Sequence, residues 1–224
     1  MKQKKLSFIE YKSYATGERA NYLNEHVNDT TDLSPDFCED ALEWETYSVA
    51  RWYLIRAVGI LRIRSAIPLV LKICREPNEK FSKSSLHLIA AWALGRIGED
   101  ALEPLILELK TSKNVQMTVC IVDALGEIGS PEAIPSLDDA FRKKEPEVKL
   151  WAALSLMKIG KRALDTLYNL YSDSRDLAEI ILVLDAIAKI NDDSSKPFVK
   201  KVLREGSEEE RKFILSNCAH LLDH

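Results

Sequence analysis

A short sequence motif recurs along this chain at a nearly constant spacing, and this repetition restricts the fold more than any other feature. Ala-Leu-Gly-Arg-Ile-Gly at residues 93–98 returns as Ala-Leu-Gly-Glu-Ile-Gly at residues 124–129, a step of 31 residues. Related segments follow at the same step at residues 155–160, 186–191 and 217–222, and another precedes them by 36 residues at residues 57–62. A fixed period of this length indicates an array of units that bury their apolar faces against one another.

Each unit is predicted to contain two helices, of which the first carries the motif at its end. In one copy, a single face of a helix with 3.6 residues per turn holds Val148, Ala152, Ser155, Leu156 and Ile159. The second helix begins directly after the motif. The motif glycines stand where the first helix must end, and glycine accepts a left-handed conformation there without strain. These glycines are Gly98, Gly129 and Gly160.

The motif resembles that of HEAT repeats, and specifically the subclass called phycobilisome-lyase HEAT-like repeats. The resemblance covers about residues 48–224 and is sharpest at residues 86–160. It fades where Arg62, Asn191 and Leu222 replace the turn glycine. The resemblance implies an all-α fold, a right-handed α-solenoid of about five to six helix pairs with a period of 31 residues. It also implies that the motif helices line a concave side, which varies to suit a partner.

We expect the solenoid to form one continuous domain over residues 34–224, with residues 1–33 as an N-terminal helical cap. Two short helices, over residues 7–15 and 18–26, are expected in the cap, with Thr16-Gly17 between them and a loop over residues 28–32. Ser34-Pro35 predicts the start of a helix, because serine is a favoured N-cap and proline suits the first helical position. The following helical stretch runs to Leu61, and we expect a bend near residues 45–47.

The expected concave surface is apolar. At about 100° per residue, two positions of each motif helix point well away from its buried face, and a third lies at the edge. These positions hold mostly aliphatic and aromatic residues where polar ones are expected, with Arg56, Asp123 and Asp185 as polar contacts and Lys212 in the last helix. We predict a partner-binding groove formed by Trp52, Arg56, Leu88, Trp92, Val119, Asp123, Leu150, Trp151, Leu154, Ile181 and Asp185. The edge position, which includes Trp151, can equally belong to the core, because a helical wheel does not decide such positions.

No pattern of residues indicates catalysis, so we expect no catalytic residue, no metal and no cofactor. The histidines are isolated, and no serine or cysteine lies in a nucleophile motif. His220 and His224 have the spacing of two ligands on one helix face, but a third ligand is missing. The remaining histidines are His26 and His87.

Charge and cysteine usage restrict the compartment and the partners. A net charge of −4 argues against a general attraction to nucleic acid or to anionic lipid. No apolar run approaches the roughly 18 residues of a membrane span, and the basic start is not followed by the apolar core of a signal peptide. We expect a cytoplasmic protein. Its cysteines are far apart in sequence without a CxxC motif, which favours reduced thiols over disulfides or zinc; they are Cys38, Cys74, Cys120 and Cys218.

The leading hypothesis is a non-enzymatic scaffold or adaptor that grips a helix or tail of a partner protein in the groove. The resemblance suggests, as an alternative, a subunit of a bilin lyase or a chromophore-binding protein, in which Asp123 or Asp185 pairs with the pyrrole nitrogens of a tetrapyrrole. An acidic immunity or antitoxin-type inhibitor is a further alternative. The acidic balance argues against a HEAT-like DNA glycosylase, and the lack of His-Glu pairs excludes a HEAT-repeat deoxyhypusine hydroxylase.

Overall fold

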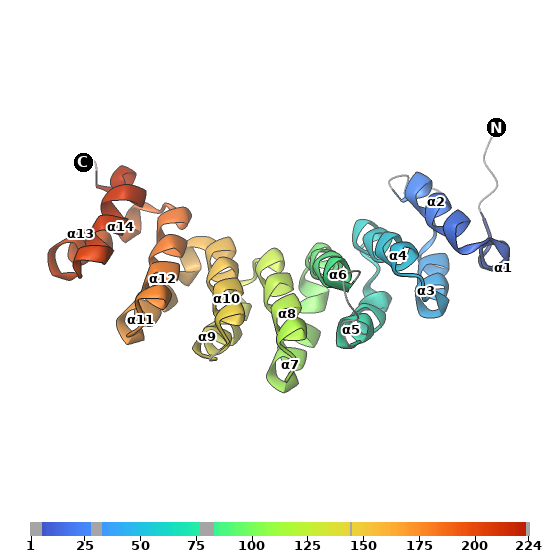
Figure 1. Ribbon diagram of the computed structural model, residues 1–224, viewed down its shortest axis with the longest axis horizontal. Helices are drawn as coiled ribbons and strands as arrows, with labels where there is room; N and C mark the ends of the chain where they lie inside the picture. Colours follow the sequence, from blue (N-terminus) through green and yellow to red (C-terminus); the bar gives the residue numbers. More distant parts are fainter. Residues whose placement is uncertain (1–5, 28–32, 77–82, 144, 223–224) are drawn as a thin grey trace. The chain divides into compact units, whose positions relative to one another are not determined.

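The chain folds into paired α-helices. A computed structural model describes residues 6–27, 33–76, 83–143 and 145–222, and no β-strand occurs in these ranges. The described residues pack into two compact units, one within residues 1–128 and the other within residues 129–224. The prediction of an all-α repeat fold is confirmed (Figure 1).

Unit 1 contains the first eight α-helices and unit 2 the next six. In unit 1 these are α1 (Phe8–Ser13), α2 (Thr16–His26), α3 (Pro35–Trp44), α4 (Ser48–Leu61), α5 (Ile67–Arg75), α6 (Lys83–Ile97), α7 (Leu102–Thr111) and α8 (Val115–Ile128). In unit 2 they are α9 (Ile134–Arg142), α10 (Pro146–Ile159), α11 (Leu164–Asp173), α12 (Leu177–Ile190), α13 (Lys196–Glu205) and α14 (Glu208–Asn217). A short 3₁₀ turn leads into each of α5, α7, α9, α11 and α13.

The helices that end in the repeated motif, here called the motif helices, pack on one another. In unit 1, α6 lies against both α4 and α8, and in unit 2, α12 lies against both α10 and α14. Small side chains at these contacts are fully buried, as Ala90 and Ala93 are in α6 and as Ala152 and Ser155 are in α10. Because these side chains are short, neighbouring helix backbones come close together, as the sequence predicts.

The α6–α8 contact is so close that a glycine is required in it. A β-carbon added at Gly95 would lie 2.3 Å from the Cβ of Glu127 in α8. In the same way, a β-carbon at Gly59 in α4 would lie 2.8 Å from the Cα of Ala93 in α6. Two of the motif glycines therefore serve helix packing.

Other motif glycines end their helices with a positive φ, as predicted, but not in the left-handed helical region. Gly98 has φ 86° and ψ −143°, and Gly160 has φ 79° and ψ −142°. This combination is essentially restricted to glycine. Where the motif lacks glycine, Arg62 (φ 52°, ψ 49°) and Asn191 (φ 51°, ψ 47°) adopt the left-handed helical conformation instead, which other residues can reach at a modest cost.

The N-terminal helices pack on the first helices of the repeat, α1 against α3 and α2 against α4. One detail of the prediction is wrong, and another is only partly right. Thr16 and Gly17 begin α2 rather than separating two helices, because the Glu18 carboxylate accepts a hydrogen bond from the Ala15 N–H and completes the first turn. The predicted bend is a full break between α3 and α4. The loop predicted at residues 28–32 lies outside the described residues.

Glu45 lies at this break and explains it. Its buried carboxylate accepts hydrogen bonds from the hydroxyl of Tyr11 (2.9 Å), from Nε of Arg19 (2.7 Å) and from the main-chain N–H groups of Thr46 and Tyr47 (both 3.0 Å). Burial alone would raise the pKa of Glu45, but these hydrogen bonds outweigh it and hold the pKa below its ordinary value. Glu45 therefore joins α1 and α2 to the start of α4.

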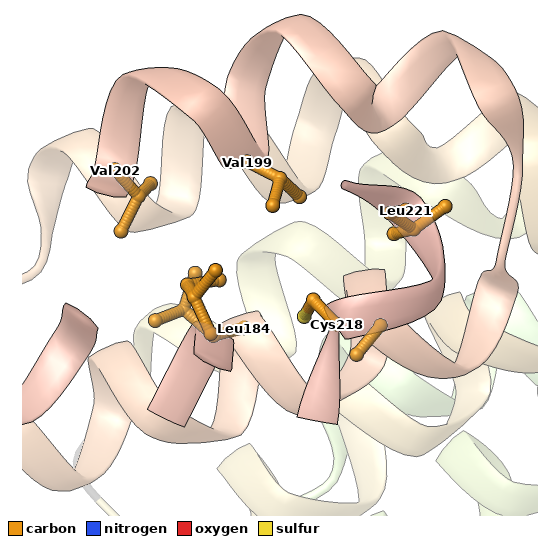
Figure 2. Close-up of a cluster of buried hydrophobic side chains, with 7 residues drawn as sticks. Leu184, Val199, Val202, Cys218 and Leu221 are labelled. Atoms are coloured by element: carbon orange, nitrogen blue, oxygen red, sulfur yellow. The ribbon is translucent and has the colours of Figure 1, made fainter. Parts of the chain in front are cut away.

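The predicted start of α3 is confirmed, because the hydroxyl of Ser34 accepts a hydrogen bond from the N–H of Phe37 at 3.2 Å, with Pro35 in the first helical position. At the other end of the chain, one core cluster of unit 2 is built mainly of aliphatic side chains. Figure 2 shows side chains of α12, α13 and the C-terminal turn converging there, among them those of Leu184, Val199 and Leu221.

Candidate partner-binding face

The predicted groove residues lie on the motif helices, and we call the set the candidate face. In unit 1 it comprises Trp52, Arg56, Leu88, Trp92, Val119 and Asp123, and in unit 2 Leu150, Trp151, Leu154, Ile181 and Asp185. The face has one part on α4, α6 and α8 of unit 1 and another on α10 and α12 of unit 2. The solvent exposure of the side chains in the face differs widely from residue to residue.

In unit 1, two tryptophans and an arginine meet between α4 and α6. The guanidinium carbon of Arg56 lies 5.7 Å from the ring centroid of Trp52 and 6.0 Å from that of Trp92, within the range of cation–π attraction. The ring of Trp92 also packs on the backbone of α4 at Gly59, where a β-carbon would come within 2.7 Å of its Cζ3 atom. These three side chains are half-buried.

Leu88 lies one turn before Trp92 on the same helix and is the most open member of the face, with 55% of its surface exposed. Leu88 and Trp92 are spaced i, i+4, so they share a face of α6. Tryptophan and arginine are enriched at the centres of protein interfaces. This part of the face holds two tryptophans and one arginine beside the exposed leucine.

The prediction that Val119 and Asp123 are exposed on the face is wrong. Val119 and Asp123 are only 8% and 9% exposed. Every residue of α8 from Met117 to Gly126 is buried, so this helix is covered around its whole circumference and not along one stripe. A helical wheel treats each helix alone and therefore cannot predict this.

In unit 2, the face is apolar on α10 and partly charged on α12. Leu150 is 40% exposed, and Trp151, Leu154 and Ile181 are half-buried. The carboxylate of Asp185 accepts a hydrogen bond from Nζ of Lys189 at 2.6 Å. Asp185 therefore has a cationic partner one turn along its own helix.

Sequence reasoning missed Leu177, which begins α12 and is 45% exposed. It lies one helical turn before Ile181, so the same i, i+4 spacing that identifies the other members could have found it. The alignment of the repeats begins after Leu177 in this helix, so Leu177 is not among the positions compared between repeats.

A polar cavity of about 390 Å³ in unit 1 was also not predicted. Its walls are Leu42, Glu43, Glu45, Thr46, Ser48, Arg51, Leu69, Lys72, Ile73 and Glu76. The guanidinium of buried Arg51 holds both carboxylate oxygens of Glu76, at 2.7 and 2.8 Å, and so ties α4 to the end of α5. Basic and acidic side chains pair within these walls, which gives the cavity no strong preference for either sign of charge.

His87 and the cysteines lie in the interior, whereas His220 is exposed. His87 is buried, with its Nε2 atom 3.1 Å from the carbonyl oxygen of Cys74. All four cysteines are free and buried. No group of three or more histidine, cysteine or acidic residues among the described residues could hold a metal ion. His224 lies outside the described residues.

None of the described helices combines the length and the apolar character that crossing a bilayer requires.

Comparison with known proteins identifies the repeat. The family profile for HEAT repeats matches residues 83–157 and, in a second overlapping match, residues 102–184. No curated protein is significantly similar in sequence. Among solved structures, the complex of CpcE and CpcF of phycocyanin lyase from Nostoc sp. PCC7120 is similar, with 19% identity and a TM-score of 0.50 over 99% of this chain and 97% of that chain. At this identity the likeness shows a shared fold. The predicted HEAT repeats are confirmed over the matched residues 83–184.

Proposed function

We propose that this protein is a binding scaffold that holds a segment of a partner protein on the candidate face. The observation that carries the proposal is the exposure of Leu88 and Leu150 at equivalent positions of two motif helices, beside half-buried aromatic residues. Apolar side chains gathered on an exposed face indicate an interaction site more often than scattered ones do. The similar solved structure is itself a complex of two proteins, which agrees with a protein partner.

Within each unit, the members of the face lie on neighbouring motif helices, which favours an extended or helical segment as the bound part of the partner. In unit 1, Trp52, Arg56 and Trp92 would supply the well-packed contacts that dominate binding energy, with Leu88 as the exposed anchor. We place no catalytic step on this face.

The proposal is tested by comparing two leucine variants that differ only in location. Leu88→Asp removes the anchor from the face, whereas Leu107→Asp introduces the same change on α7, where the leucine is 65% exposed and lies off the face. Trp92→Asp is less suitable, because Trp92 packs on Gly59 and its loss would disturb the α4–α6 contact. Leu150→Asp is the corresponding variant in unit 2.

Each variant is immobilised and used to capture proteins from a lysate of the source organism, with quantitative mass spectrometry as the readout. We expect partners of the wild type to be retained by Leu107→Asp and lost with Leu88→Asp or Leu150→Asp, while all variants melt near the wild-type temperature. Partners that survive both substitutions on the face, or that are lost equally with Leu107→Asp, would exclude the face as the binding site.

A second candidate function is the binding of a linear tetrapyrrole, because the similar fold belongs to a complex described as phycocyanin lyase. Arg56 between two indoles offers aromatic and cationic contacts that suit such a ligand. The carboxylates expected to meet the pyrrole nitrogens argue against it, since Asp123 is buried and Asp185 is paired with Lys189. Mixing the protein with a linear tetrapyrrole and recording visible absorbance decides the matter, because an unshifted band excludes binding.

A further inference from the structure

Two cysteines that are far apart in sequence meet in the interior of unit 1. Cys74 lies in the last turn of α5 and Cys120 in α8, and their Sγ atoms are 3.4 Å apart. Both residues are almost completely buried. A disulfide requires an S–S distance of about 2.05 Å, so the two sulfur atoms must approach by only about 1.4 Å to form one.

The two thiols belong to a small polar cluster that joins three helices. The Cys120 thiol donates a hydrogen bond to the main-chain oxygen of His87 in α6 (3.4 Å), and the ring of His87 contacts the main-chain oxygen of Cys74. His87 directly precedes Leu88, the most exposed residue of the candidate face. The cluster therefore links α5 and α8 across the helix that carries Leu88 and Trp92.

We propose that Cys74 and Cys120 form a reversible disulfide when the protein is exposed to a hydroperoxide, and that this bond fixes α5 to α8. In the first step, one cysteine sulfur attacks the O–O bond of hydrogen peroxide, becomes a sulfenic acid and releases one water. In the second step, the sulfur of the other cysteine attacks the sulfenic sulfur, the S–S bond forms, and the hydroxyl leaves with the thiol proton as a second water. Two thiols thus lose two electrons and two protons to one peroxide. A small thiol reverses the reaction by exchange.

The surroundings of the pair make this a slow reaction. The hydrogen bond with Cys74 and complete burial raise the pKa of the Cys120 thiol well above its ordinary value. Because the thiolate is the reactive species, its small population limits the rate at neutral pH. The pair therefore responds to sustained oxidation and not to brief exposure.

Once formed, the bond would stabilise the fold. It closes a loop spanning the 46-residue separation between the two cysteines, and closing a loop of this length lowers the entropy of the unfolded chain. We expect oxidation to raise the melting temperature by roughly 5–15 °C, and reduction to reverse the shift.

The test uses the full chain with Cys38→Ser and Cys218→Ser, which leaves only the two thiols of the pair. The protein is incubated with hydrogen peroxide, and the products are mapped as non-reduced peptides by mass spectrometry. We expect one intramolecular link between the peptides that contain Cys74 and Cys120, a loss of about 2 Da for the two hydrogen atoms removed, and the rise in melting temperature. Adding Cys120→Ser to this background should abolish all three changes.

Unfolding in urea provides the reference, because both thiols are then accessible to peroxide. The proposal is wrong if the folded protein keeps both thiols after an exposure many times longer than the one that oxidises them in urea, or if the link joins two chains. Should the serine substitutions at Cys38 and Cys218 prevent folding, the wild-type protein is mapped in the same way, and the absence of a Cys74–Cys120 peptide pair overturns the proposal equally.

Discussion

Replacing Gly98 or Gly160 by alanine should destabilise the protein purely through the backbone. Both residues end a motif helix in a conformation with positive φ and strongly negative ψ. A β-carbon added at either position would meet no atom within 4 Å. Steric overlap with the rest of the protein is therefore absent, and only the conformational strain of a side chain in this region remains.

The size of the effect follows from the cost of that region. A non-glycine residue held there costs of order 1–3 kcal/mol. Alanine also restricts the unfolded chain, which offsets about 0.4–1 kcal/mol of this cost. We therefore expect each variant to lose up to about 2.6 kcal/mol of unfolding free energy. For a chain of this size that corresponds to a fall in melting temperature of up to about 10 °C.

Gly17→Ala is the matched control, because this glycine also has no atom within 4 Å of an added β-carbon but lies in the first turn of α2. There alanine suits the helix, so the same substitution should stabilise slightly, by up to about 0.5–1 kcal/mol. Thermal unfolding followed by far-ultraviolet circular dichroism measures all three variants. The reasoning fails if Gly98→Ala and Gly160→Ala are as stable as Gly17→Ala.

Three further changes test other parts of the structure. Gly59→Ala should lower the free energy of unfolding by about 1–3 kcal/mol, because the added β-carbon would collide with Trp92 and Ala93. The tryptophan fluorescence of the folded protein should change as well. An unchanged spectrum and an unchanged stability would exclude the close α4–α6 contact. Glu45→Gln should lower the free energy of unfolding by about 3–5 kcal/mol, because Arg19 then lacks its buried carboxylate partner. Unfolding in denaturant measures this loss. The pKa of Glu45 is lower in the folded state than in the unfolded chain, where it is about 4.3, so the ionised carboxylate stabilises the fold fully above that pH. This stabilisation is lost as the pH falls below about 4 and through the folded pKa. The wild type should therefore lose unfolding free energy in this range, whereas Glu45→Gln should not. Arg62→Gly should be neutral or stabilising by up to about 1 kcal/mol, because arginine is strained in the left-handed conformation, and a clear loss of stability would refute that strain.

The order of helices and their ends could be predicted from sequence because the signals are local. The motif repeats every 31 residues, and each copy contains both the small residues of a helix contact and the residue that ends the helix. Ser34 and Pro35 likewise act within one turn. The break between α3 and α4 was only partly predicted, since it depends on Glu45 meeting Tyr11 and Arg19 from other helices.

The exposure of the side chains in the candidate face could be predicted only where a single helix decides it. Leu88 and Leu150 are exposed as the wheel predicts, whereas Val119 is buried by the helices around α8. The Cys74–Cys120 contact was not predictable either, because it joins a motif helix to an intervening helix at a separation of 46 residues, which is no multiple of the repeat. Contacts of this kind depend on how successive pairs pack.

The repeat itself shows that packing does not demand the apolar residues of the face. The position occupied by Leu88 and Leu150 is Lys212 in α14, where the lysine is exposed and the helix still packs on α12 and α13. A lysine at the equivalent place would not be tolerated if the position belonged to the core, since burying an unpaired charge is strongly unfavourable. In α14 the fold therefore needs no apolar residue at this position, although the equivalent Val119 in α8 is buried. Leu88 and Leu150 stay 55% and 40% exposed, which supports the proposal that a partner covers them.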